Sequence, residues 1–425
     1  MSDYPDTYYA TTVDPGKPRP ALSGDHETDV CIIGAGFSGI STALHLAELG
    51  VKVTVLEAQR IGWGATGRNA GQIVNGLHRE LSYYQQKCDA QTCATFAKLQ
   101  FEGARILHRV IDDYAIDCDL GKTQVMAATS SKWVAELEQK LVDWQLTGEA
   151  DAEVVKGNRI RDFVNIERYK AILVDRRGGS LNPLKLVLAE AQQVEKLGGT
   201  VHEHSEVTRL ETGNTTRVFT DSGCVRAKKV VVCGNAYLEG LIPAPQRSSI
   251  VAGSQILWTE PLQQAHADSL IPSRACIEEG DLDANFYRLT QDNRMLFGAG
   301  LNLGHQDREK IIRVIRPRML KLFPSLRDTS IVSGWSGNFL MTVNHTPQIN
   351  RIGDSIYYAQ GYNAFGITTT HLAGRAIAQA ITSRSAEFDA FSKLTHMPIP
   401  GGKILRVPYV MTGAYVYRIR DRLGI

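Results

Sequence analysis

A glycine-punctuated run near the N-terminus constrains the fold of this chain more than any other feature. Residues 30–33 are uninterrupted apolar residues, which is typical of a parallel strand buried on both faces. Gly34, Gly36 and Gly39 follow in the pattern GxGxxG, and apolar positions then recur at helical spacing. A second, alternating strand is expected at 51–56. The sequence therefore predicts a βαβ unit of about 30 residues.

The glycines and a later acid in this unit are suited to a dinucleotide. The first glycine permits a tight turn, the second lets a pyrophosphate approach the backbone, and the third lets the helix pack on the strand. The helix N-terminus favours phosphate, and Glu57 can accept hydrogen bonds from ribose hydroxyls while disfavouring a 2′-phosphate. The alternative is a glycine turn without a ligand. The residues predicted to bind this half of the cofactor are Gly34, Gly36, Phe37, Ser38, Gly39, Glu57 and Ala58.

A second glycine-rich segment at residues 60–72 decides between NAD and FAD. Its four glycines and few bulky side chains would let the backbone lie flat against an isoalloxazine ring, which an NAD enzyme does not need. A mobile surface loop is the alternative interpretation. The sequence therefore favours FAD, and the residues predicted to line the flavin are Ala65, Thr66, Gly67, Arg68, Asn69, Gly71 and Gln72.

The rest of the chain indicates two interleaved domains, as expected for 425 residues. Helical periodicity predicts helices at 86–112, 131–146, 183–196 and 306–322. Alternating residues between 250 and 300 predict a mainly antiparallel sheet, and residues 356–381 read as a strand followed by a helix that returns to the first domain. We expect an FAD-binding domain formed by 1–85, 180–245 and 340–425, and a substrate domain formed by 86–179 and 246–339.

Composition and charge exclude several classes of protein. Lys and Arg are scattered and the net charge is +2, which does not suit a nucleic-acid binder. Seven cysteines without a CxxC pair indicate reduced thiols and no zinc site, and His202-Glu203-His204 reads as a solvated strand face, so no metal is expected. The polar N-terminus and the short apolar runs predict a cytoplasmic protein without a membrane partner.

The two glycine segments and Glu57 resemble the glycine/D-amino-acid-oxidase-like flavoprotein family, and the similarity continues through 175–183, 230–235 and 361–368. This resemblance implies an α/β fold in which a glutathione-reductase-type FAD-binding Rossmann domain is interleaved with a smaller α+β substrate domain on a mainly antiparallel sheet. It also implies that the Val207 backbone holds the adenine. The further residues it assigns to FAD are Gly234, Gly361, Tyr362, Gly366, Ile367 and Thr368.

The chain departs from the family where substrate specificity is set. Amino-acid oxidases of this family tend to carry an arginine that binds the substrate carboxylate beside the flavin, whereas residues 337–345 here contain no arginine or lysine. We therefore expect an amine whose carboxylate lies far from the reacting carbon. The segments 67–75, 287–290 and 337–340 and the tail 400–424 resemble members that oxidise γ-glutamylated polyamines. The alternatives are oxidation of a secondary amine or N-methyl amino acid, and a non-catalytic flavin-binding protein.

Candidate substrate contacts follow from these segments. An aromatic cage for the ammonium group and ordinary core packing both remain open for the aromatic candidates. His78 and His345 are candidate bases, although a lone histidine is more often structural. No base need be essential, since a pocket of low polarity lowers the amine pKa. The substrate-pocket candidates are Asn75, Tyr287, Arg288, Trp335, Phe339 and Tyr362.

The resemblance also bears on the flavin and its electron acceptor. Some relatives attach the flavin to a late cysteine, but no cysteine follows Cys276, so we expect non-covalent FAD. Relatives that use a lysine to speed the reaction with oxygen differ from residues 281–303, which contain none. The sequence thus predicts hydride transfer from a small-molecule amine to FAD and leaves open the catalytic base, the oligomeric state, and whether oxygen or another molecule is the acceptor.

Overall fold

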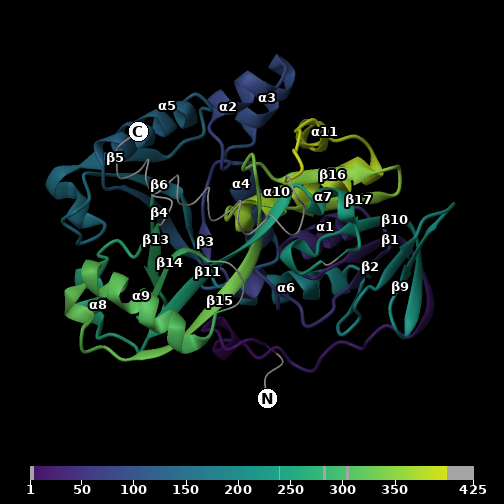
Figure 1. Ribbon diagram of the computed structural model, residues 1–425, viewed down its shortest axis with the longest axis horizontal. Coiled ribbons are helices and arrows are strands. Elements are labelled where there is room, and N and C mark those ends of the chain that lie inside the picture. Colours follow the sequence, from purple (N-terminus) through teal and green to yellow (C-terminus); the bar gives the residue numbers. More distant parts are fainter. Residues whose placement is uncertain (1–3, 239, 281–283, 303–305, 400–425) are drawn as a thin grey trace.

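The computed structural model describes residues 4–238, 240–280, 284–302 and 306–399, so the tail segments at 400–424, including residues 415–422, lie outside the described part. Two sheets, one in each half of the molecule, organise the chain (Figure 1). Among the described residues, no helix has both the length and the apolar character that crossing a membrane requires.

The first sheet has a parallel centre assembled from distant parts of the chain. Its strands run in the order β16-β17-β10-β1-β2-β7, and a hairpin of β8 and β9 extends from β10. Residues 30–33 of the central strand are buried on both faces, as their apolar run predicts. The strands are β1 (Gly24–Ile33), β2 (Val53–Leu56), β7 (Thr200–His202), β8 (Arg209–Glu211), β9 (Thr216–Phe219), β10 (Gly223–Val232), β16 (Gln348–Ile352) and β17 (Ile356–Gln360).

Helices α1 (Phe37–Glu48), α6 (Pro183–Lys196) and α10 (Gly366–Thr382) pack together on this half. The contact between α1 and α10 is close, because a Cβ at Gly374 would lie 2.5 Å from the Ser41 hydroxyl oxygen. The α/β half therefore holds the N-termini of both α1 and α10 in fixed positions.

The helix predicted at 86–112 is wrong in its extent. The chain forms three helices there, α2 (Leu81–Lys87), α3 (Ala90–Lys98) and α4 (Glu102–Asp113). Asp89 explains the first break, because its side chain accepts a hydrogen bond from the Thr92 amide and caps α3.

The second sheet is mainly antiparallel, as predicted. Its order is β15-β11-β14-β13-β12-β4-β6-β3, with β5 beside β6, and the pair β12–β4 is parallel. The strands are β3 (Gln72–Ile73), β4 (Gly121–Ala128), β5 (Ala152–Lys156), β6 (Ala171–Ser180), β11 (Ser249–Thr259), β12 (Cys276–Glu279), β13 (Asn285–Leu289), β14 (Met295–Asn302) and β15 (Ile331–Thr342). Figure 1 shows α5 (Ser131–Gln145) at one end of this half, and α8 (Gln264–Leu270) and α9 (Arg308–Leu322) at the other.

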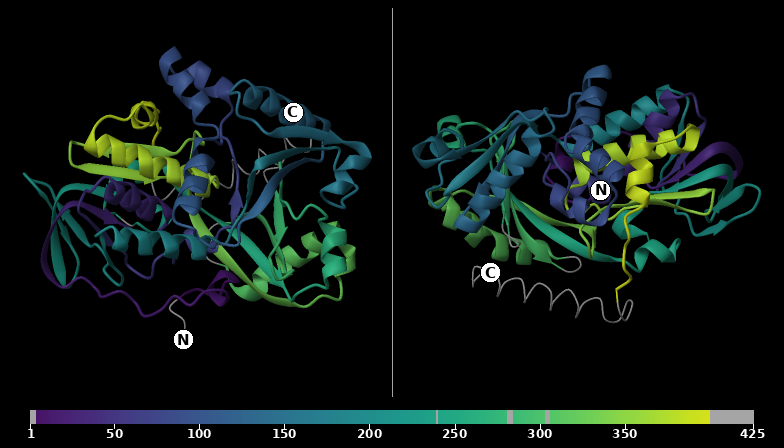
Figure 2. Two further views of the ribbon diagram at one scale, coloured as in Figure 1. Left: turned by 180° about the vertical axis from the view of Figure 1, so that it is seen from behind. Right: turned by 90° about the horizontal axis from the view of Figure 1, so that it is seen from above.

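The partition into domains is less sharp than the sequence boundaries suggest. Helix α4 lies in the segment predicted for the substrate domain but packs against α10, and α3 contacts α11 (Ala386–Ser392). Both views in Figure 2 show these helices beside the α/β half. The domain boundaries at 85, 179, 245 and 339 stay a prediction.

The N-terminal lead-in is more buried than an irregular segment suggests. Tyr4, Tyr8 and Tyr9 are buried, and the Tyr9 ring contacts Trp335 edge-on at 5.8 Å. Residues 4–23 thus run along one edge of the molecule and contribute to its core (Figure 1, purple).

Candidate active site

A cavity of about 1320 Å³ lies between the α/β half and the second sheet. Both glycine-rich segments line it, together with residues of β4, β12, β13 and β15. The structure thereby brings together residues that the sequence predicts for the cofactor. Those lining the cavity are Gly34, Gly36, Phe37, Ser38, Glu57, Ala58, Ala65, Thr66, Arg68, Asn69, Gln72, Val207, Gly234, Tyr362, Gly366, Ile367 and Thr368. Gly39, Gly67, Gly71 and Gly361 are not in the lining.

The first glycine turn has the geometry that a pyrophosphate needs. Gly34 adopts φ +100°, a conformation that suits glycine, and a Cβ there would lie 3.0 Å from the Cys233 carbonyl oxygen. Gly36 is the N-cap of α1. A Cβ at Gly39 would collide with the Gly34 carbonyl oxygen, so only glycine allows α1 to pack this closely.

Glu57 follows β2 directly and is fixed by backbone amides. Its Oε2 accepts a hydrogen bond from Ala35 N at 2.7 Å and its Oε1 from Gln59 N at 2.9 Å. Burial raises the pKa of Glu57, and the amide hydrogen bonds oppose that rise. The residue also lines the cavity, and its contact with a ribose stays a prediction.

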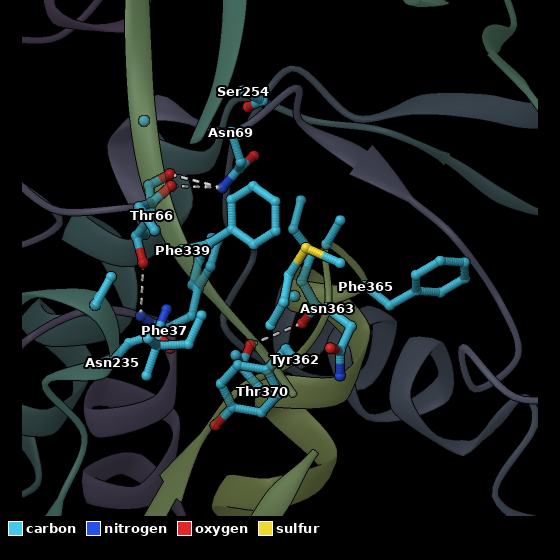
Figure 3. A pocket seen from close by; sticks show the side chains of 18 of the residues that line it. Phe37, Thr66, Asn69, Asn235, Ser254, Phe339, Tyr362, Asn363, Phe365 and Thr370 are labelled. Atoms are coloured by element: carbon cyan, nitrogen blue, oxygen red, sulfur yellow. Dashed lines mark hydrogen bonds between the residues drawn. The ribbon is translucent and has the colours of Figure 1, made fainter. Parts of the chain in front are cut away.

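The second glycine segment is ordered by its own polar side chains. Thr66 Oγ1 accepts a hydrogen bond from Phe37 N at 3.0 Å, which joins the two glycine segments. Asn69 Nδ2 donates to the Thr66 carbonyl at 2.8 Å, and Asn69 Oδ1 accepts from Gly71 N at 2.8 Å. Figure 3 shows Thr66 between Phe37 and Asn69 at the cavity wall. The segment is therefore a shaped wall and not a mobile loop.

Two of the predicted substrate contacts instead support this segment from behind. Arg288 donates to the carbonyl oxygens of Ala70 at 3.0 Å and Leu181 at 2.9 Å. Trp335 Nε1 donates to the Arg68 carbonyl at 2.9 Å. Both side chains are buried outside the cavity lining, so the structure corrects their placement as substrate contacts.

Asn75 and Tyr287 are corrected in the same way. Asn75 Nδ2 donates to Asp175 at 2.8 Å, and the Tyr287 hydroxyl is hydrogen-bonded to that of Tyr169 at 2.8 Å. Neither lines the cavity. Strand alternation explains Tyr287, because its neighbour Phe286 lines the cavity and successive side chains of a strand point to opposite faces.

Phe339 and Tyr362 do line the cavity, but they differ in what they face. Figure 3 shows the Phe339 ring within the cavity. The Tyr362 hydroxyl is 2.6 Å from Ser38 Oγ at the start of α1. The Tyr362 hydroxyl therefore faces the predicted phosphate end of the cofactor. Burial raises the pKa of Tyr362.

The cavity contains cations, although none comes from β15. Arg68, Arg79 and Lys140 line it. The sequence predicts that residues 337–345 supply no cation to bind a substrate carboxylate, and this says nothing about cations from other segments. Arg68 is stacked over the Trp63 ring at 4.2 Å, and Lys140 pairs with Glu80 at 2.8 Å. Arg79 Nε donates to the Asn344 carbonyl at 2.9 Å, and no described carboxylate lies within ion-pair distance of it.

The two candidate bases lie together in the cavity wall. The rings of His78 and His345 stack with centroids 4.8 Å apart, and Phe365 contacts His78. Burial lowers the pKa of His78 to about 3, aided by the nearby His345, and lowers that of His345 to about 4. Both imidazoles are therefore neutral at neutral pH.

Sequence reasoning missed two glutamates. Glu278 lines the cavity from β12, whose sequence Cys-Ile-Glu-Glu has no alternation that would have singled it out. Glu203 is buried and accepts hydrogen bonds from Ile61 N and Arg19 N, each at 2.7 Å, so the solvated strand face predicted for 202–204 was wrong. Among the described residues, no group of three or more His, Cys, Asp or Glu side chains could hold a metal ion.

Comparison with known proteins shows which family the chain belongs to. Residues 29–380 match the family model described as FAD dependent oxidoreductase. The chain belongs to this family. FAD is therefore its cofactor and it is an oxidoreductase, as the sequence predicts. Non-covalent attachment of the FAD stays a prediction.

Similar proteins span the whole chain. The chain is 41% identical to "Gamma-glutamylputrescine oxidoreductase" of Escherichia coli (strain K12), over 100% of both chains. It is 32% identical to "Probable oxidoreductase OrdL" of Haemophilus influenzae, over 98% of this chain and 97% of the relative.

Solved structures confirm the predicted fold class. L-proline dehydrogenase from P. horikoshii matches with a TM-score of 0.73 and 18% identity, over 87% of this chain and 97% of the other. Glycine oxidase from Geobacillus kaustophilus matches with a TM-score of 0.72 and 18% identity, over 88% of this chain and 100% of the other.

The residues of the cavity fit FAD. The tight turn at Gly34, the close packing at Gly39 and the backbone-held Glu57 suit the ADP half, and residues 65–72 suit the flavin. Helix α10 begins at Gly366 beside the cavity, so the partial positive charge of its N-terminus is available to the flavin. When bound, FAD accepts the hydride that the substrate loses.

Proposed function

We propose that this enzyme oxidises the carbon next to the primary amine of γ-glutamylputrescine or of a similar γ-glutamylated polyamine. The imine product hydrolyses to an aldehyde and ammonia, and hydrogen peroxide forms if oxygen is the acceptor. The 41% identity over the full length of a relative named for this substrate supports the proposal.

The observation that carries the proposal is the shape and charge of the cavity beyond the flavin-lining segments. There the cavity continues between the segment 78–83 and helix α5, which leaves room for an extended substrate. Phe339, and no cation, faces the cavity from β15, which disfavours a carboxylate next to the reacting carbon. Arg79 lines the same cavity and donates to the Asn344 carbonyl, and we propose that it binds the carboxylate at the other end of the substrate.

Rapid mixing under anaerobic conditions tests the substrate class. We expect γ-glutamylputrescine to bleach the flavin absorbance faster than sarcosine or proline does. The reverse order would support the alternative of a secondary amine or N-methyl amino acid and would contradict the proposal. Admitting air to the reduced enzyme and assaying peroxide then identifies oxygen, or excludes it, as an efficient acceptor.

Arg79 provides a sharper test of how the substrate lies. We expect Arg79→Met to raise KM for γ-glutamylputrescine by about tenfold, because a charge-assisted hydrogen bond to the far carboxylate is lost. KM for a simple alkylamine should not change. The matched control is Arg161→Met, which removes an exposed arginine paired with exposed Glu167. An equal effect on both amines would contradict this orientation.

A further inference from the structure

One carboxylate in the cavity has the position that binding of an amine requires. Glu278 lies on β12 and lines the cavity, and its cross-strand neighbours Met126 on β4 and Phe286 on β13 line it too. Side chains directly opposite one another on adjacent strands share a face of the sheet. Glu278 is thus a single carboxylate between two apolar side chains on the face that covers the cavity.

A hydrogen bond fixes this face against the flavin-lining segment. Gln72, which ends that segment, donates from Nε2 to the Ile277 carbonyl oxygen at 3.0 Å. Ile277 immediately precedes Glu278 and points into the core on the opposite side of the sheet. The backbone of Glu278 is therefore tied to the part of the cavity where the flavin ring is expected.

Five other carboxylates line the cavity, those of Glu57, Glu80, Glu136, Glu206 and Glu279, and the first two and the last have partners elsewhere. Glu57 is held by backbone amides at the ribose end, and Glu80 pairs with Lys140. Glu279 accepts hydrogen bonds from Tyr169 at 2.8 Å and from Asn285 at 2.6 Å. Among the described residues, no lysine or arginine lies within ion-pair distance of Glu278. A bound ammonium group would supply that missing charge.

We propose that Glu278 binds the reacting amine of the substrate and takes a proton from it. The substrate enters as an ammonium ion, one N–H bond breaks, an O–H bond forms on the Glu278 carboxylate, and the neutral amine that remains is the form able to lose hydride. No charge is created in this transfer, because an ammonium–carboxylate pair becomes an amine and a carboxylic acid. The assignment rests on the proposed function, since it concerns the same primary amine.

The surroundings of Glu278 suit this exchange. Burial raises the pKa of Glu278 to about 7, while Lys140 and the side chain of Gln124 lower it. The other titratable groups around this part of the cavity are Glu136 on α5, the segment residues His78, Arg79 and Glu80, Glu279 and Cys276 on β12, and Asp175 on β6. A carboxylate in this range ionises near neutral pH, whereas the neutral His78 and His345 are weak proton acceptors.

The test measures kcat/KM for flavin reduction by anaerobic mixing across a pH series. Glu278 is ionised above about 7, so kcat/KM of the wild type should rise as pH passes through that value. Glu278→Gln should lower kcat/KM by about 10²-fold and abolish this rise, because the amide neither attracts ammonium nor accepts its proton. Bound FAD, measured as flavin absorbance per protein, should not change.

Two further variants test whether the effect of Glu278→Gln comes from the loss of the carboxylate at this position. Glu278→Asp retains the carboxylate, so the rise with pH should persist at a lower kcat/KM; a kcat/KM equal to that of the wild type would overturn the proposed contact. Glu138→Gln removes an exposed carboxylate of α5 that pairs with Lys156 outside the cavity, and should leave the profile unchanged.

Two results with Glu278→Gln would overturn the assignment. One is a kcat/KM within about twofold of the wild type with the same pH dependence. The other is a loss for γ-glutamylputrescine without any loss for a simple alkylamine, which would place Glu278 at the far end of the substrate. If the wild type instead prefers a different amine, the proposed substrate fails, and the same pH series with that amine still decides the role of Glu278.

Discussion

The two glycine-rich segments that wall the cavity are held in place in different ways. The first is fixed by its neighbours in the sheet: Gly34 N donates to the Leu56 carbonyl at 2.8 Å, and Gly39 packs on Gly34. The second is held by remote residues, among them Arg288 and Trp335. The spacing of glycines in the sequence is therefore enough to identify the first segment, whose turn is determined locally. The second segment is shaped by tertiary contacts, so the sequence reveals only that it is rich in glycine.

The largest effect is expected where the second segment depends on a remote residue. Arg288→Met should lower the free energy of unfolding by about 4 kcal/mol, because the buried Leu181 carbonyl and the half-buried Ala70 carbonyl lose their charged donor. Urea denaturation of the holoenzyme measures this loss. The exposed Arg161→Met control should change it by less than about 0.5 kcal/mol. Equal losses in the two variants would show that Arg288 does not support the segment.

A slightly smaller effect is expected for the local packing of the first segment. Gly39→Ala places a Cβ against the Gly34 carbonyl oxygen and should cost about 3 kcal/mol, with loss of bound FAD. Flavin absorbance per protein and the thermal midpoint report the two effects. Gly213→Ala, where a Cβ would meet its nearest atom at 3.4 Å, is the matched control. Normal FAD content in Gly39→Ala would show that FAD binding does not depend on the packing of Gly39 against Gly34.

A substitution that keeps the shape of Glu57 but removes its charge tests FAD binding by the first segment separately from folding. Glu57→Gln should weaken FAD binding by about tenfold, because a neutral amide binds ribose hydroxyls less strongly and its NH2 group cannot accept the hydrogen bond from Ala35 N. Quenching of flavin fluorescence during titration of the apoprotein measures Kd. An unchanged Kd would remove Glu57 from the cofactor site.

The smallest effect is expected from a single neutral hydrogen bond to the second segment. Trp335→Phe removes the donor to the Arg68 carbonyl and should cost about 1 kcal/mol. Because this residue acts through the loop, the flavin absorption maximum should shift while Kd for FAD stays the same. A change in Kd without a spectral shift would mean that Trp335 acts on the ADP half of the site.

Elements with local start and stop signals were predictable from the sequence. Helix α6 begins after Asn182, whose side chain accepts a hydrogen bond from Lys185 N at 3.3 Å, and Pro183 occupies its first turn. The segment 86–112 was not predictable from periodicity alone, because its apolar spacing from Phe96 to Val110 continues across the break between α3 and α4.

Site residues were predictable from the sequence where a local motif determines which way their side chains or backbone amides point. Gly34, Gly36 and Glu57 lie at the cavity because a strand, a turn and a helix follow one another directly. Arg288 and Glu278 could not be placed from the sequence. Both lie on strands of the second sheet, and the pairing of those strands with distant parts of the chain decides what each side chain faces. The support that Tyr9 gives to Trp335 joins residues far apart in the sequence, and no local pattern encodes it.

The order of strands in the first sheet has a consequence for how the protein is made. Gly24 of β1 pairs with Gly223 of β10, and Val230 of β10 pairs with Ile356 of β17. A ribosome adding about 5–20 residues per second reaches β10 on the order of 10–40 s after β1. During that interval an apolar strand edge of the nascent chain waits for its partner. More chaperone should therefore increase the yield of folded enzyme more than a stronger promoter does.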